Sequence, residues 1–334
     1  MRIIRLDHTS VNFVFSTDWH LTDNPPGRRT GDYRDQIMAK VNFCADLAHQ
    51  VNGVHLCGGD VFHSKSPSAR GNTFSLLTAL EYALRRNPLG TQFGTHGNHD
   101  IYMDRTDSIP SQPIGALIAS GAYTDISTES IIFENADGSV RVQVDAYPYA
   151  DDLVTLDRVL NAPPRVEGVT YRIVLMHQYG SPESNPTMFG TPIIGFDTMA
   201  ACDYDMALWG HDHSRTETVT VGNCTHVRLG SLSRASLAMD EVDRPVAAAV
   251  ISFKPNKIGF KEVLVPVKPL EIAFTAANNE VERVRQSDEV IQFFKEMDTA
   301  VTGIESTDER DVLRELCPAN EPKLYDLAAE LCGL

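Results

Sequence analysis

Short apolar runs separated by polar or glycine-rich segments recur along most of the chain. Runs rich in β-branched and aromatic residues, bounded by turn residues, indicate buried strands. Asn135–Ser139, with the sequence NADGS, predicts a hairpin turn between two of them. The predicted strands are Val11–Ser16, Val54–Cys57, Gly90–Thr95, Ile131–Phe133, Val140–Val144, Ile173–Met176, Met206–Trp209, Val219–Val221, Val227–Leu229, Val246–Phe253 and Ile258–Val265.

Two segments between the early strands have the periodicity of amphipathic helices. Tyr33–Val51 places apolar residues on one stripe, and Asn72–Arg86 forms a second helical pattern that ends at Asn87-Pro88. Strands that alternate with helices predict an α/β domain built of packed layers.

The pattern changes after Pro269. Three short, acidic, amphipathic helices are predicted at Glu289–Met297, Asp308–Leu316 and Glu321–Leu331. We therefore expect a catalytic domain over residues 1–269 and a small helical C-terminal extension over residues 270–334.

Composition places the chain among globular proteins. Its 334 residues allow one large domain or two, and no apolar run is long enough to span a membrane. The N-terminal segment does not have the pattern of a signal peptide, and the six cysteines form no CxxC pair. Reduced thiols and a cytoplasmic location are expected, or the host cytoplasm if the protein is phage-encoded.

The net charge of −16 argues against a general nucleic-acid binder. The charge is uneven, however, because residues 271–334 contain 15 acidic and 6 basic residues and so carry −9 of it. The catalytic domain is much less acidic than the whole chain, which weakens the objection.

Five polar clusters each follow an apolar strand. In open α/β sheets, sites form at the carboxyl ends of strands, so these clusters are expected to converge on one crevice. Imidazole and carboxylate groups without thiolate suit a pair of divalent ions such as manganese, iron, zinc or cobalt. The clusters are Asp18-Trp19-His20, Gly58-Gly59-Asp60 with His63, Gly97-Asn98-His99-Asp100, His177, and Gly210-His211-Asp212-His213.

The ordered series DxH, GDxxH, GNHD, H and GHxH resembles the calcineurin-like metallophosphoesterase superfamily. The resemblance implies a sandwich of two mixed β-sheets flanked by helices and two divalent ions, with Mn²⁺ preferred and Fe, Zn, Co or Ni as alternatives. It also implies that Asp60 bridges the ions, that His99 is the catalytic histidine, and that Asp100 orients His99. By the same resemblance, Asp18, His20 and His213 complete one metal site, and Asn98, His177 and His211 the other.

Three further segments are similar to the SbcD-like nuclease subunit of DNA repair complexes. They are GGDVFHS with His63, DAYPY at residues 145–149, and LGSLSR at residues 229–234. The resemblance implies a DNA exonuclease or endonuclease in which His63 joins the catalytic residues. An SbcC-like ATPase partner or a homodimer, docked through the C-terminal extension, would follow from the same resemblance.

The substrate is left open between DNA and a small molecule. The loop PPGRRTGDYR follows the first cluster, and its Arg28, Arg29 and Arg34 are candidates for contacts with substrate phosphates. Only about 65 residues follow the catalytic domain. That length is short for both the capping domain and the partner-binding segment of an SbcD-like protein, so a small-molecule or cyclic-nucleotide phosphodiesterase is the alternative.

Overall fold

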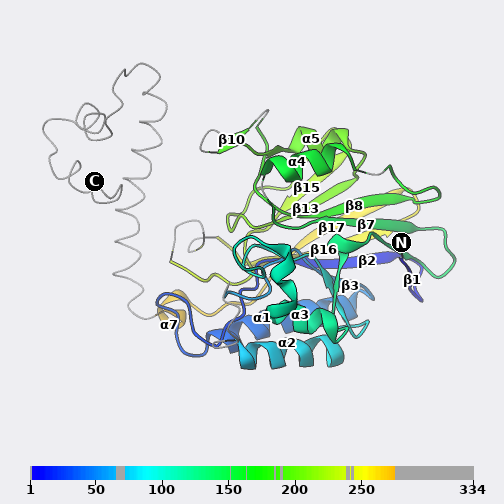
Figure 1. Cartoon of the computed structure of the whole chain (residues 1–334). Coiled ribbons are helices and arrows are strands. Elements are labelled where there is room, and N and C mark those ends of the chain that lie inside the picture. The colour runs from blue at the N-terminus through cyan, green and yellow to red at the C-terminus, as the bar shows by residue number, and fades with distance from the viewer. Residues whose placement is uncertain are drawn as a thin grey trace, which may run out of the picture. The chain divides into compact units, whose positions relative to one another are not determined.

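Two β-sheets pack face to face in the computed structural model, and helices cover the outer face of each (Figure 1). This arrangement is the two-sheet α/β sandwich predicted from the sequence. The structure describes residues 2–64, 72–150, 152–162, 164–183, 186–188, 191–237, 241 and 244–274.

The first sheet has six strands within the described residues. Its middle strands β2, β3 and β4 are parallel neighbours, whereas β16 pairs antiparallel with β2 and β17. The spatial order is β17 (Lys257–Leu264), β16 (Ala247–Lys254), β2 (Val11–Ser16), β3 (Val54–Cys57), β4 (Gln92–Gly94) and β5 (Tyr123–Asp125).

The second sheet has seven strands in the same described part of the chain. Strands β7, β8, β13 and β15 run parallel, and antiparallel pairs occur at β6–β7 and β14–β15. The order is β1 (Arg2–Arg5), β6 (Ile131–Glu134), β7 (Arg141–Tyr147), β8 (Tyr171–His177), β13 (Met206–Gly210), β15 (Cys224–Arg228) and β14 (Val219–Val221).

The helices lie in two outer layers (Figure 1). Helices α1 (Tyr33–Gln50), α2 (Thr73–Arg85) and α3 (Pro113–Ala119) cover the six-stranded sheet, and α4 (Asp152–Leu160) and α5 (Phe196–Ala201) cover the other. Minor elements are β9 (Gly180–Ser181), β10 (Thr187–Met188), β11 (Thr191–Pro192), β12 (Ile194–Gly195), the 3₁₀ turns Thr106–Ser111 and Ile126–Thr128, and α7 (Leu270–Ala273).

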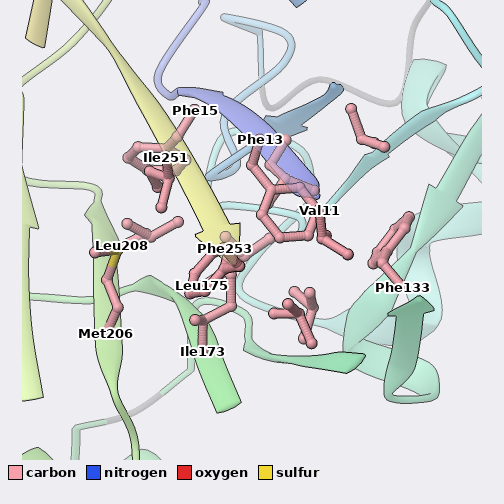
Figure 2. Close-up of a cluster of buried hydrophobic side chains, with 14 of the residues drawn as sticks. Val11, Phe13, Phe15, Phe133, Ile173, Leu175, Met206, Leu208, Ile251 and Phe253 are labelled. Carbon is pink, nitrogen blue, oxygen red and sulfur yellow. The ribbon is translucent and has the colours of Figure 1, made fainter. Parts of the chain in front are cut away.

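The main core fills the space between the two sheets (Figure 2). Alternate residues of β2 supply it, because side chains on a strand point to opposite faces: Phe13 and Phe15 enter this core, whereas Val14 packs toward α1. The rings of Phe13 and Phe133 meet edge to face across the sheets at 5.2 Å. The two sheets are therefore held at a fixed spacing, which positions their carboxyl ends relative to one another.

The predicted strands and both predicted long helices are present, with ends that differ by a few residues at most. Short elements were missed: β1 is a largely exposed edge strand, and α3 begins at Pro113 and has only seven residues. Neither is long enough to show a clear period.

The residues that follow position 269 pack against the catalytic domain as far as they are described. Ala273 and Phe274 are buried, and the Thr30 N–H donates to the Ala273 carbonyl at 3.0 Å. The three predicted helices after residue 275 lie outside the described residues, so the domain boundary stays a prediction. Within the described ranges, no helix combines the length and apolar character needed to cross a bilayer.

Candidate metal centre

The five polar clusters lie where strands of both sheets end. Asp18, Asp60 and Asn98 follow the parallel strands β2, β3 and β4, whereas His177 ends β8 and His211 follows β13, its parallel neighbour. Because the two sheets pack face to face, these strand ends meet at one edge of the sandwich.

One group of potential ligands consists of Asp18, His20, Asp60 and His213. One ligand atom from each lies within 4.8 Å of all the others. The Nε2 atoms of His20 and His213 are 2.9 Å apart, and Asp18 Oδ1 is 3.8 Å from His213 Nε2. This spacing suits ligands that point at a common cation.

A second group adjoins the first through Asp60. Its Oδ2 is 3.6 Å from His20 Nε2 and 3.4 Å from His177 Nε2, so one carboxylate oxygen lies between the two groups. The second group continues with His211, whose Nδ1 is 3.0 Å from Asn98 Oδ1. Asp60 therefore occupies the position expected of a carboxylate shared by two ions.

Residues of both groups hold their backbone in a conformation that side-chain-bearing residues rarely adopt. The φ angles are 54° at Asp18, 50° at His20, 51° at Asp60 and 78° at His211. Hydrogen bonds between the clusters compensate: the His20 N–H donates to the Asp60 carbonyl at 2.9 Å, and the His211 N–H donates to the Asp18 carboxylate at 3.2 Å. Strain concentrated in this way is typical of functional sites.

Glycines let the chain approach the ligands closely. A Cβ atom at Gly97 would lie 2.1 Å from Asp60 Oδ1, and one at Gly59 would lie 2.3 Å from His177 Nδ1. Only glycine fits at either position, which explains the glycines of the second and third clusters.

The protonation of the site suits cation binding. Burial lowers the pKa of His20, and burial followed by the charge of His177 lowers that of His211 to about 3, so both rings are neutral near pH 7. Burial also opposes a charge on His177, but the carboxylate of Asp60 outweighs it and raises the pKa to about 9. A cation between these rings would replace such protons.

Hydrogen bonding inside the site is incomplete. His177 Nε2 is buried and pairs with Asp60 Oδ2 at 3.4 Å, but it has no hydrogen-bond partner in the described part of the chain. A buried polar atom in this state is costly unless something else binds it. Together with the oxygen and imidazole donors, it indicates that the residues fit divalent cations.

His99 and His63 lie beside the first group. The His99 N–H donates to Asp60 Oδ1 at 2.8 Å, its ring meets that of His20 edge to face at 4.7 Å, and it stacks on His63 at 5.4 Å. His99 Nδ1 is 2.6 Å from the His63 carbonyl oxygen. A carbonyl can only accept, so Nδ1 carries the hydrogen, and Nε2 is the nitrogen available to a substrate.

The predicted contact between Asp100 and His99 is wrong. Asp100 is buried, and its carboxylate accepts hydrogen bonds from the backbone N–H groups of Val61, Phe62 and Gly97 at 3.0–3.2 Å. It therefore ties the second and third clusters together, and the His63 carbonyl is the group that orients His99.

The three arginines of the PPGRRTGDYR loop lie in different environments. Arg29 is buried, and it donates to the Arg234 carbonyl at 3.0 Å and to Gln36 at 2.7 Å. The prediction that it contacts substrate is therefore wrong, because its guanidinium is used within the fold. The Arg34 guanidinium pairs with Asp23, with Nη1 3.4 Å from Oδ1, and Arg28 is exposed.

We expect Arg29→Ala to reduce stability and leave catalysis nearly unchanged. The substitution leaves buried acceptors without a donor, which typically costs about 1–3 kcal/mol. Urea denaturation measures the loss, and Arg28→Ala, at an exposed position, should change it by less than about 0.5 kcal/mol. A stable Arg29→Ala protein with lost activity would restore Arg29 as a substrate contact.

Two neighbours of the site were missed by the sequence analysis. Glu241 is buried, with Oε1 2.7 Å from His213 Nδ1, and Thr17 Oγ1 donates to Asp18 Oδ2 at 2.6 Å. Thr17 could have been suspected because it directly precedes the first cluster. Glu241 lies 28 residues after His213 in an acidic stretch, and nothing in its local sequence distinguishes it.

Comparison with known proteins agrees with this geometry. The family model for the calcineurin-like phosphoesterases matches residues 11–215, which include all five clusters. The chain belongs to this family, whose members are metal-dependent phosphoester hydrolases that bind a divalent metal pair.

The wider comparisons are less informative. No curated protein sequence matches the chain. Among solved structures, a crystal structure of the calcineurin-like phosphoesterase YfkN from Bacillus subtilis is similar to it, with 12% identity and a TM-score of 0.47. The similarity covers 84% of this chain and 97% of that one.

Proposed function

We propose that this protein is a binuclear metal-dependent phosphodiesterase that cleaves DNA in the manner of an SbcD-like nuclease subunit. The observation that carries the hydrolase part is the position of Asp60 between two ligand groups, with His99 beside the first. The nuclease part is supported by the GDxFH form of the second cluster, whose His63 ring stacks on His99.

The proposed ligands follow the two groups. Asp18, His20 and His213 with Asp60 would hold one ion, and Asn98, His177 and His211 with Asp60 would hold the other. When bound, such a pair lowers the pKa of a water molecule and neutralises phosphate oxygens. Manganese is the preferred metal because nitrogen and oxygen donors without thiolate suit it, with Fe, Zn, Co and Ni as alternatives.

His99 supplies proton chemistry in this proposal. Its Nδ1–H is held by the His63 carbonyl, so a protonated ring presents Nε2–H to the leaving oxygen of the phosphodiester. The ring of His63 stacks on His99 at 5.4 Å, and its pKa is lowered to about 4 by burial and by the charge of His99. A neutral His63 can donate a hydrogen bond to the same phosphate through its one ring N–H.

Two tyrosines favour a substrate that carries bases. The half-buried rings of Tyr149 and Tyr179 lie 5.1 Å and 4.3 Å from the ring of His211. Aromatic rings beside a phosphate site can stack on nucleobases. Tyr149 belongs to the DAYPY segment on which the nuclease resemblance rests.

A small-molecule or cyclic-nucleotide phosphodiesterase is the second candidate. The net charge of −16 and the burial of Arg29 both reduce the basic surface available to a polynucleotide. Arg28 and Arg34 stay as proposed phosphate contacts. An SbcC-like ATPase partner or a homodimer stays a proposal for residues 270–334.

A panel of substrates separates the two candidates. Linear duplex DNA, single-stranded DNA, a cyclic nucleotide and bis-p-nitrophenyl phosphate would each be incubated with the full chain and Mn²⁺. The nuclease proposal predicts cleavage of DNA that weakens steeply with salt, because phosphate contacts release counterions. Rapid turnover of the cyclic nucleotide with no DNA cleavage would reject it in favour of the second candidate.

A further inference from the structure

His213 is the least enclosed member of the first ligand group. Its side chain is 26% exposed, whereas those of Asp18 and His20 are at most 1% exposed. Packing therefore fixes the other ligands more firmly than it fixes the His213 ring. Some other contact must hold this ring if Nε2 is to face the site.

Glu241 provides that contact. Its Oε1 lies 2.7 Å from His213 Nδ1, and its Oε2 accepts a hydrogen bond from the Ser236 N–H at 3.2 Å. A carboxylate next to Nδ1 places the hydrogen on that nitrogen and leaves the Nε2 lone pair directed at the site. The rings of His20 and His177 differ: in the described part of the chain His20 Nδ1 has no partner, and His177 Nδ1 uses the Gly58 carbonyl.

The Glu241 carboxylate is also held by a hydrogen bond on its other oxygen. The Ser236 N–H that donates to Oε2 belongs to the stretch of chain 231–236, which also contacts His213. Arg244 donates to the Ser231 carbonyl at 2.6 Å, and the Ser231 N–H donates to the His213 carbonyl at 3.3 Å. Residues 231–236 thus contact both Glu241 and the backbone of His213.

The same stretch of chain also contacts the first cluster. Lys40 is buried and donates to the carbonyls of Leu232 and Ser233 at 2.8 and 2.9 Å. The N–H groups of these two residues donate to the carbonyls of Thr17 and Asp18 at 2.9 and 3.2 Å. The LGSLSR segment therefore fixes the first and last ligand clusters relative to each other.

We propose that Glu241 is a positioning residue for the metal pair. It fixes the tautomer and orientation of His213, so that Nε2 binds the ion shared with Asp18, His20 and Asp60. The inference rests on the ligand assignment proposed above and does not depend on whether the substrate is DNA.

Manganese binding to the full chain tests the proposal without any substrate. Equilibrium dialysis with elemental analysis gives the Kd of each ion, and electron paramagnetic resonance reports whether the two ions are magnetically coupled. Loss of such a carboxylate typically weakens metal binding about 10–100-fold. Glu241→Ala should raise the Kd of one ion toward the upper end of that range and abolish the coupling at limiting Mn²⁺. Glu241→Gln keeps an acceptor oxygen and should raise the Kd toward the lower end.

Two further variants test whether the effect is specific to the contact between Glu241 and His213. Glu262→Gln changes an acid that pairs with Arg215 at the surface, and it should bind both ions like the wild type. The double variant His213→Ala/Glu241→Ala should bind Mn²⁺ no more weakly than His213→Ala alone, because Glu241 acts through that ring.

Either of two results overturns the proposal: wild-type affinity for both ions in Glu241→Ala, or additive losses in the double variant. If Glu241→Ala does not fold, an unchanged Kd in Glu241→Gln overturns it instead. A wild-type protein that binds fewer than two ions would count against the ligand assignment itself, which is a separate outcome.

Discussion

Asp60→Asn should abolish phosphodiester hydrolysis and remove one Mn²⁺ per chain. Asparagine keeps an oxygen that can accept the His99 N–H, now donated to Asp60 Oδ1 at 2.8 Å. It removes the negative charge that lies between His20 and His177 at 3.6 and 3.4 Å. A metal ion contributes several kcal/mol to the transition state, so the rate should fall about 10³-fold or more.

The measurement combines turnover of bis-p-nitrophenyl phosphate with elemental analysis after dialysis. Asp107→Asn is the matched control, because Asp107 pairs with Arg105 on an exposed turn. An Asp60→Asn protein that retains two tightly bound ions, or full activity with one, would show that Asp60 is not a shared ligand.

His99→Ala should retain both ions and lose about 10²–10⁴-fold in rate on DNA, the range expected for removal of a general acid. The side chain belongs to neither ligand group as proposed, and the bond from His99 to Asp60 uses the backbone N–H, which alanine keeps. Bis-p-nitrophenyl phosphate should suffer a smaller loss, because nitrophenolate leaves with little need of a proton.

His49→Ala is the matched histidine control, since His49 lies exposed on α1 and contacts the Arg86 carbonyl at 2.8 Å. Equal losses on the two substrates would argue against proton donation by His99. Loss of an ion in His99→Ala would instead make it a ligand.

The local sequence predicted those parts of the site that depend on neighbours along the chain. Strands such as Val11–Ser16 and Val54–Cys57 were predicted to the residue, because each is a short apolar run ended by polar residues or glycine. The ligand types follow directly after these strands, so their convergence could be expected from the way that parallel strands share one edge. Gly59 and Gly97 belong to the same clusters, and a side chain at either position would collide with a ligand residue.

Contacts between distant segments were decided only by the tertiary structure. Asp100 and Arg29 were given the wrong partners, because a carboxylate or guanidinium can pair with any group that folding brings near it. In this fold those groups are the N–H donors of Val61 and Phe62, and the Arg234 carbonyl, which lies 205 residues away from Arg29.

Glu241 is a further residue whose contact with the site could not be predicted from its local sequence. Its buried carboxylate lies 2.7 Å from His213 because folding brings together two positions that are 28 residues apart in the chain. The left-handed backbone at Asp18, His20, Asp60 and His211 likewise depends on hydrogen bonds between clusters. Local propensity disfavours that conformation, so only the assembled sheets can impose it.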